Sequence, residues 1–346
     1  REMEMMKCVV KEQKGDGYIV LTQRPVPEVG DNEVLIRVKA VAICGTDVHI
    51  KHWDDYAQKR MQPPTIIGHE YAGVVAKVGK NVKSVQTGDV VNSDSHLVCG
   101  TCDLCRNGHA DVCYNTVVIG VHRDGAMAEY ICIPESDVNK CDPAMPMEHL
   151  ALMEPLGVAV HAAMEFPIAT KKVAVIGCGP IGCMGVAVAK TLGAAQVIGI
   201  ELNEQRVQMA LDMGADAVVN PLKEDTAAKV KELSGGLGVD FVLDFSGNAG
   251  AVTGSFDYLK PDGTVVIAGL GPKPMTLEWE RLVTGGYCVK GVSGREIPKT
   301  WERMKGLFAA GLDISKVITH VLPLEEFEAG LDLMETGQCG KVVLKP

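Results

Sequence analysis

The chain has 346 residues, which is enough for about two domains of roughly 150 residues each. Apolar residues make up 47% and charged residues 23%, a globular composition that excludes a disordered or collagen-like chain. Its 44 acidic residues outnumber its 34 Lys and Arg, and the net charge of −10 argues against binding to nucleic acid or anionic membranes.

The first 150 residues predict many short strands that Gly and Pro separate. This pattern is typical of a compact, partly open β-barrel. The clearest strands are expected at 33–43, 71–79 and 88–93. The character of the sequence changes near residue 148, where 149–165 predicts a helix with a kink at Pro155.

From residue 171 onward, nearly continuous apolar strands alternate with helical segments. This alternation predicts a parallel sheet covered by helices on both faces, and therefore an α/β fold. The strands are expected at 171–177, 196–201, 217–220, 239–246, 263–269 and 287–292, and the helices at 180–192 and 203–214.

The C-terminal part predicts a helix from residue 298, an amphipathic helix at 323–337 and a closing strand in GKVVLKP. We expect these pieces to return to the first domain, because a barrel interrupted by an inserted sheet needs its chain to come back. The predicted domains are therefore 1–155 together with 299–346, and 156–298.

Residues 177–182 form the string G-x-G-x-x-G, with Gly177, Gly179, Pro180 and Gly182 at the start of a predicted helix. The glycines permit a tight turn and the close approach of a pyrophosphate, and the helix N-terminus supplies amide donors.

An acidic residue, Glu201, ends the next predicted strand. It suits a ribose 2′-hydroxyl and disfavours a 2′-phosphate, so NAD is expected rather than NADP. Arg206 leaves this preference open, because a nearby Arg can accommodate a phosphate. The alternative is a structural glycine turn beside a solvated glutamate.

Four cysteines, Cys99, Cys102, Cys105 and Cys113, lie within one short segment that has little apolar character. Four thiolates at such spacing can close a tetrahedron around zinc, which defines a structural site. Burial of four free cysteines explains their spacing poorly.

A second, dispersed set combines Cys44, His69, Glu70 and Glu154. A mixture of sulfur, nitrogen and carboxylate ligands can leave one coordination position open, as catalytic zinc requires. Sequence separation alone does not show that these residues meet in space.

Five segments follow one another along the chain: CGTDVHI, PPTIIGHEYAGVV, the four-cysteine segment, MEPLGVAVHA and GCGPIG. They occur in the order found in the zinc-dependent medium-chain alcohol dehydrogenases, and the chain resembles that family over nearly its whole length. Within the family it is most similar to the threonine dehydrogenase branch, through 44–60, 95–116, 294–301 and 311–320.

The resemblance implies a GroES-like catalytic domain, a Rossmann nucleotide domain, NAD, and two zinc ions per chain, one catalytic and one structural. It implies Cys44, His69 and a carboxylate, either Glu70 or Glu154, as ligands of the catalytic zinc. Thr46 and His49 match a proton-relay pair, and His96 matches a histidine near the substrate. The matching cofactor contacts outside the glycines are Ile181, Glu201, Arg206, Leu270 and Val292.

The implied reaction is the oxidation of a secondary alcohol, L-threonine to 2-amino-3-oxobutanoate, with hydride transfer to NAD. Two departures from the branch affect the substrate pocket: Val158 stands where Asn is frequent, and NSDS precedes His96. A polyol or vicinal-diol dehydrogenase therefore remains an alternative. A nucleotide-binding sensor is a second alternative, but such a module needs neither an open zinc nor a proton relay.

The resemblance also implies a homotetramer that acts on a small-molecule alcohol, with 263–269 and 287–292 as candidate edge strands for assembly. No signal-peptide pattern is present, and the uncharged run at 173–189 is too short and too rich in glycine to span a bilayer. We therefore expect a cytoplasmic protein.

Overall fold

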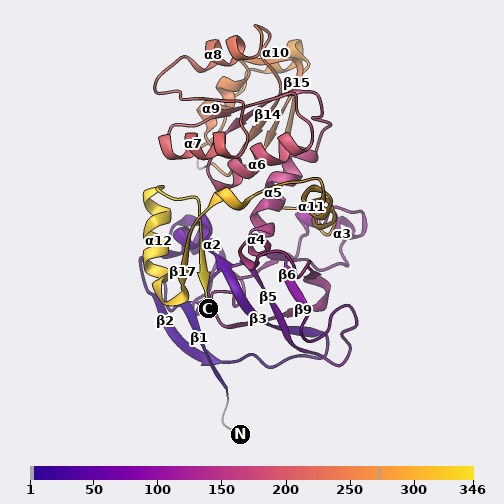
Figure 1. The fold of residues 1–346 in the computed structure, drawn as a ribbon, viewed down its shortest axis with the longest axis vertical. Coiled ribbons are helices and arrows are strands. Elements are labelled where there is room, and N and C mark those ends of the chain that lie inside the picture. Colours follow the sequence, from indigo (N-terminus) through magenta and orange to yellow (C-terminus); the bar gives the residue numbers. More distant parts are fainter. Residues whose placement is uncertain (1–3, 272) are drawn as a thin grey trace. The chain divides into compact units, whose positions relative to one another are not determined.

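The computed structural model describes residues 4–271 and 273–346, and these residues form two compact units (Figure 1). The first unit extends to Glu154 and resumes at Ile318, whereas the second spans Pro155–Val317. The predicted first domain also included residues 1–3, which lie outside the described residues. No helix among the described residues is long and apolar enough to cross a membrane.

The first unit is built mainly of short strands. They are β1 (Met5–Lys11), β2 (Ile19–Pro25), β3 (Glu33–Ala42), β4 (Thr65–Ile66), β5 (Glu70–Val78), β6 (Val90–Ser93), β7 (His96–Leu97), β8 (Val117–Val118), β9 (Tyr130–Pro134), β10 (Val138–Lys140), β17 (Ile318–Pro323) and β18 (Lys341–Lys345). Its helices are α1 (Gly45–His52), α2 (Asp55–Arg60), α3 (Asp103–Arg106), α4 (Met147–Ala151) and α12 (Phe327–Thr336), with 3₁₀ turns at Ala110–Val112, Glu135–Asp137 and Leu324–Glu326.

The largest sheet of this unit has the order β10-β6-β5-β3-β18-β17, and β9 also pairs with β3. The C-terminal strand β18 therefore lies beside β3, with Val343 opposite Ala42. Helix α12 lies beside β17 in Figure 1 and packs Phe327 and Leu331 into the same apolar core as Ile43. The last 29 residues are thus an integral part of the first unit, because they complete its sheet and its core.

The second unit alternates strands and helices. Its strands are β11 (Lys172–Ile176), β12 (Gln196–Ile200), β13 (Ala217–Val219), β14 (Val239–Asp244), β15 (Leu259–Ile267) and β16 (Cys288–Gly291). Its helices are α6 (Pro180–Thr191), α7 (Glu204–Asp212), α8 (Thr226–Leu233), α9 (Ala249–Ser255), α10 (Trp279–Gly285) and α11 (Lys299–Ala309), with a 3₁₀ turn at Ser315–Val317; helix α5 (Met153–Met164) contains the division between the units.

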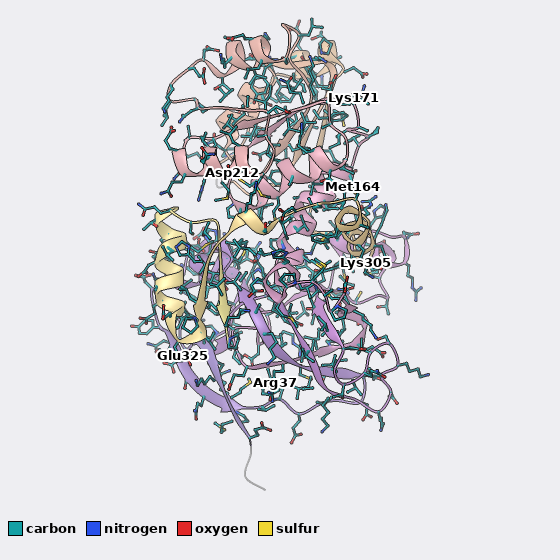
Figure 2. All side chains as sticks on the ribbon, viewed as in Figure 1. Arg37, Met164, Lys171, Asp212, Lys305 and Glu325 are labelled. Atoms are coloured by element: carbon teal, nitrogen blue, oxygen red, sulfur yellow. The ribbon has the colours of Figure 1, made fainter. Side chains whose placement is uncertain are left out.

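All pairs in this sheet are parallel, and its order is β13-β12-β11-β14-β15-β16. That order is the doubly wound arrangement of dinucleotide-binding domains. Strand β11 is buried along Val173–Ile176, as expected for a strand covered on both faces. Side chains fill the space between the strands and the helices of each unit (Figure 2).

The structure differs from the predicted elements in three places. The helix expected at 149–165 is two helices, because the turn at Leu152 ends α4 before α5 begins. Helices α1, α2 and α3 of the first unit and α8, α9 and α10 of the second were not predicted. The helix that begins at Lys299 stays in the second unit, where Lys316 of the following turn donates to the Asp212 carbonyl at the end of α7. The return to the first unit therefore comes at Ile318, later than the predicted residue 299.

The glycine at position 182 yields a test of this fold. A Cβ there would lie 1.8 Å from the Gly177 carbonyl oxygen, so helix α6 can pack on its strand only with glycine. We expect Gly182→Ala to destabilise the protein by about 2 kcal/mol or more.

The matched control is Gly306→Ala in helix α11, where a Cβ meets no atom within 4 Å. This change removes a flexible helical residue, and we expect it to stabilise the protein by about 0.5–1 kcal/mol. Urea unfolding midpoints of both variants measure the difference, and a shift in the same direction for both would contradict the packing argument.

Candidate functional site

Helix α1 positions the first group of predicted site residues. Cys44 is its N-cap, in extended conformation, and the Asp47 carboxylate accepts the Cys44 backbone N–H at 2.8 Å. This reciprocal capping fixes the start of the helix, as expected for an N-cap residue paired with an acidic residue three positions later. The thiol of Cys44, the hydroxyl of Thr46 and the imidazole of His49 therefore occupy defined positions on the first two turns.

The structure brings Cys44 together with His69 and Glu70. One ligand atom from each of the three residues lies within 4.8 Å of the others. Gly68, with φ of +87°, turns the chain so that His69 precedes strand β5, and Glu70 is the first residue of that strand. Both His69 and Glu70 are buried.

The chemistry of this cluster fits zinc. Nδ1 of His69 is buried without a hydrogen-bond partner among the described residues, an arrangement that costs free energy unless another group satisfies the nitrogen. Asp47, also fully buried, lies close enough to act on His69: burial raises the pKa of Asp47, and His69 opposes this rise. A sulfur, a nitrogen and a carboxylate form a donor set that suits zinc and leaves one position open.

Glu70 is also one half of a buried ion pair. Both of its carboxylate oxygens accept hydrogen bonds from Lys341 Nζ at 2.6 Å, and Lys341 donates to the Ile43 carbonyl at 3.2 Å. Burial raises the pKa of Glu70, and the Lys341 ammonium opposes this rise. Lys341 comes from the closing strand β18, so the last strand of the chain contributes directly to this site.

Glu154 does not belong to the compact set of Cys44, His69 and Glu70. Its carboxylate is buried in the first turn of α5 and accepts a hydrogen bond from Ser95 Oγ at 2.5 Å. The next residue, His96, begins β7, and its backbone N–H donates to Asp94. The choice between Glu70 and Glu154 as a zinc ligand thus remains a prediction.

The predicted relay pair lies on the same short helix as Cys44. Thr46 Oγ1 is 3.7 Å from Cys44 Sγ, and His49 lies one turn further along α1. The His49 side chain is 56% exposed, and its Nδ1 lies 2.5 Å from the Asp54 carboxylate. Residues three apart share a helix face, so Thr46 and His49 lie on the same side of α1, the first beside Cys44 and the second exposed to solvent.

The four predicted cysteines also come together. Their sulfurs all lie within 4.8 Å of one another, with separations of 3.5 Å for Cys99–Cys113 and 4.0 Å for both Cys99–Cys105 and Cys102–Cys113. Tetrahedral zinc with bonds of about 2.3 Å places its sulfurs about 3.8 Å apart. Backbone amides, led by that of Thr101, lower the pKa of Cys99 to about 5 and so favour a thiolate.

A cavity of about 720 Å³ opens in the second unit beside the glycine turn. Gly177 and Gly179 line it together with Glu201 and Arg206. Gly177 needs its left-handed φ of +80°, and Gly179 is the N-cap of α6 with Pro180 in the first helical turn. The cavity is large enough for part of a dinucleotide. Helix α6 begins within the glycine turn, so its N-terminal amide groups lie where a pyrophosphate would bind.

Glu201 has a structural role in this turn. Its Oε2 accepts the Cys178 N–H at 2.9 Å, and its Oε1 accepts the N–H groups of Leu202 and Asn203 at 2.8 and 2.9 Å. Three of about four acceptor positions of the carboxylate are therefore used, and one position on Oε2 remains. Arg206 Nε is buried without a partner among the described residues.

The remaining predicted cofactor contacts do not line this cavity. Ile181 lies in the first turn of α6, and Leu270 and Val292 follow strands β15 and β16. Leu270 is 90% exposed. Because β15 and β16 are adjacent and parallel, these two residues share the carboxyl edge of the sheet, where ligands bind in such folds.

Sequence reasoning missed four residues that hold the site together: Asp47, Asp54, Ser95 and Lys341. Asp47 lies inside the motif CGTDVHI, and its position three residues after Cys44 is a capping signal that could have identified it. Lys341 has no local signal, because its partner is 271 residues away in the sequence.

Comparison with known proteins agrees with this geometry. The family of zinc-binding dehydrogenases matches residues 180–310, and the GroES-like domain of alcohol dehydrogenases matches residues 30–143. The chain belongs to the zinc-dependent medium-chain alcohol dehydrogenases. The predicted family, enzyme class and α/β fold, with a GroES-like and a Rossmann domain, are thereby confirmed.

Two L-threonine 3-dehydrogenases match nearly the whole chain. The chain is 44% identical to an L-threonine 3-dehydrogenase of Caldanaerobacter subterraneus subsp. tengcongensis and 43% identical to one of Bacillus subtilis, each over 99% of both chains. A solved structure of a zinc-binding dehydrogenase from Sinorhizobium meliloti 1021, bound to NADP, matches with a TM-score of 0.92 at 29% identity, over 99% of this chain and 100% of that one.

Metal analysis tests the two clusters separately. We expect about two zinc ions per chain in the unaltered protein and about one in Cys44→Ser, because serine oxygen is a much poorer zinc ligand than thiolate. The matched variant, Cys102→Ser, should also lose one zinc ion, but it should lower the thermal unfolding midpoint, since a closed cysteine site stabilises its segment. An unchanged zinc content in Cys44→Ser would contradict the assignment.

Proposed function

We propose that this chain oxidises L-threonine at its C3 hydroxyl to 2-amino-3-oxobutanoate, with NAD as the hydride acceptor. The proposal rests on one observation: the ligand atoms of Cys44, His69 and Glu70 lie close together in the first unit. Thr46 and His49 lie on the helix that begins at Cys44. Full-length similarity to L-threonine 3-dehydrogenases supports the choice of substrate over a polyol or vicinal diol.

We assign Cys44, His69 and one of the two carboxylates, Glu70 or Glu154, as ligands of a catalytic zinc. When bound, zinc supplies a Lewis acid that lowers the pKa of a substrate hydroxyl, and the nicotinamide supplies the hydride acceptor. The four cysteines hold a second, structural zinc, because their sulfurs leave no position open.

Side chains of the protein then carry the proton of the substrate hydroxyl to solvent. The Thr46 hydroxyl accepts it from the substrate hydroxyl and passes one on towards His49, whose exposed ring releases it to water. Asp54 orients this ring through the contact with Nδ1. Partial burial raises the pKa of Asp54, but hydrogen bonds with His49 and with backbone amides outweigh this effect. The pKa of Asp54 is therefore below its usual value, and Asp54 stays ionised near neutral pH.

The expected preference for NAD rests on Glu201. Its remaining acceptor position on Oε2 suits one ribose hydroxyl, and its negative charge disfavours a phosphate at the same place. Arg206 lines the same cavity, so the competition between the two side chains decides the preference.

A substrate panel with both nucleotides tests the proposed function. Initial rates with L-threonine, 2,3-butanediol, sorbitol and xylitol should give the highest kcat/KM for L-threonine, and NAD should exceed NADP at least tenfold. A higher kcat/KM for a diol or a polyol would replace threonine with the alternative substrate class, and a preference for NADP would remove the role given to Glu201.

His49→Ala tests the proton path. A neutral imidazole accepts a proton and an imidazolium does not, so alcohol oxidation through His49 should accelerate as pH rises. We expect the variant to lose this rise and to turn over about 10- to 100-fold more slowly at neutral pH.

The control for this change is His52→Ala on the same helix, where the ring contacts Asp16 and Glu335 rather than the relay. Its pH profile of kcat should match that of the unaltered protein. If His49→Ala also keeps the unaltered profile, His49 does not carry the proton.

We also propose a homotetramer that works in the cytoplasm. Strand β16 supports assembly, because it forms one edge of the parallel sheet and all four of its residues are exposed. None of the twelve cysteines forms a disulfide bond, which fits a reducing compartment. Sedimentation analysis measures the oligomeric state.

A further inference from the structure

Helices α1 and α2 carry five basic side chains near the Cys44 cluster, and four of them have carboxylate partners. The four are His49 with Asp54, Lys51 with Asp332 and Glu335, His52 with Asp16 and Glu335, and Lys59 with Asp55. The fifth is Arg60, and no carboxylate among the described residues forms an ion pair with it. An Arg without an anionic partner is available for an anionic ligand.

Arg60 is nevertheless held in place. Its guanidinium carbon lies 4.4 Å from the ring centroid of Tyr56, which is four residues earlier on the same face of α2. The centroid of the Tyr56 ring lies 6.0 Å from that of the His49 ring, and Thr46 Oγ1, on the same helix as His49, lies 3.7 Å from Cys44 Sγ. Arg60 is therefore stacked on a ring that adjoins the helix of the cluster's cysteine.

The charges around the site also favour a ligand that carries a carboxylate. Burial lowers the pKa of His122, and the positive charge of Arg60 lowers it further. Lys341, the buried cation beside the cluster, already pairs with Glu70, so it is not available to a substrate carboxylate.

We propose that Arg60, stacked on Tyr56, receives the α-carboxylate of an amino-acid substrate and so selects it over neutral alcohols. This inference rests on the proposed function, since L-threonine carries its carboxylate two carbons from the hydroxyl that is oxidised. The planar guanidinium suits a carboxylate because it can donate two parallel hydrogen bonds. Arg60 is exposed, so a ligand from solvent can reach it.

The test compares L-threonine, L-threoninamide and 2,3-butanediol in three variants. Threoninamide keeps the hydroxyl and the amine but lacks the carboxylate charge. In Arg60→Gln we expect kcat/KM for L-threonine to fall about 10- to 100-fold, mainly through KM, because a charged hydrogen-bonded pair is lost. The kcat/KM values for threoninamide and 2,3-butanediol should change less than about threefold, so the preference for threonine over its amide should collapse.

Arg60→Lys and Lys59→Gln are the matched variants. The lysine keeps the charge without the paired donors, so it should restore part of the preference. Lys59→Gln removes the neighbouring cation, which is already paired with Asp55, and should behave like the unaltered protein. Zinc content and unfolding midpoint, equal in all three variants, exclude a loss of fold as the cause.

The outcomes separate this inference from the proposed function. Threonine oxidation that keeps its KM in Arg60→Gln would overturn the role of Arg60 and leave the proposed function intact. The enzyme could instead prefer a different β-hydroxy carboxylate, such as 3-hydroxybutyrate, with the same dependence on Arg60. That result would support the role of Arg60 and overturn L-threonine as the substrate. Activity on neutral diols alone, unaffected by Arg60→Gln, would overturn both.

Discussion

The candidate zinc site depends on one buried ion pair, between Glu70 at the start of β5 and Lys341 at the start of β18. Both groups are nearly inaccessible to water, so neither can be removed alone without leaving an uncompensated charge in the interior. Lys341 also donates to the carbonyl of Ile43, the residue before Cys44. One ammonium group therefore links the strand that carries Glu70, the chain that leads to Cys44 and the final strand of the protein.

Much of the second unit was predictable because its signals are local. Strands β11 and β12 are continuous apolar runs, and the observed bounds lie within a residue of those predicted at each end. Helices α8 and α9 escaped prediction because they are short and bury few side chains. Their identifiable signals are the capping residues Asp225 and Asn248, whose side chains accept hydrogen bonds from the first-turn amides.

The sequence predicts the candidate metal ligands of the site, but it does not predict the residues that hold those ligands in place. The four cysteines recur at short, specific spacings, whereas Cys44 and His69 are far apart in the sequence and lie in motifs that resemble those of the family. The cation that holds Glu70 depends on the register of β18 against its neighbours, which no local pattern specifies. Similarly, Glu201 was expected only to meet a ribose, whereas the structure gives it three backbone donors and thus a second role in shaping the glycine turn.

The position of Lys341 also bears on how the protein is made. A ribosome releases the first unit in two pieces, with the whole of Pro155–Val317 synthesised between them. The second unit is continuous, and domains generally fold as units during synthesis, so it can fold while the first unit still lacks two strands and a helix. Glu70 therefore gains its buried counter-charge, and the first unit its strands β17 and β18, only after the whole second unit has been synthesised.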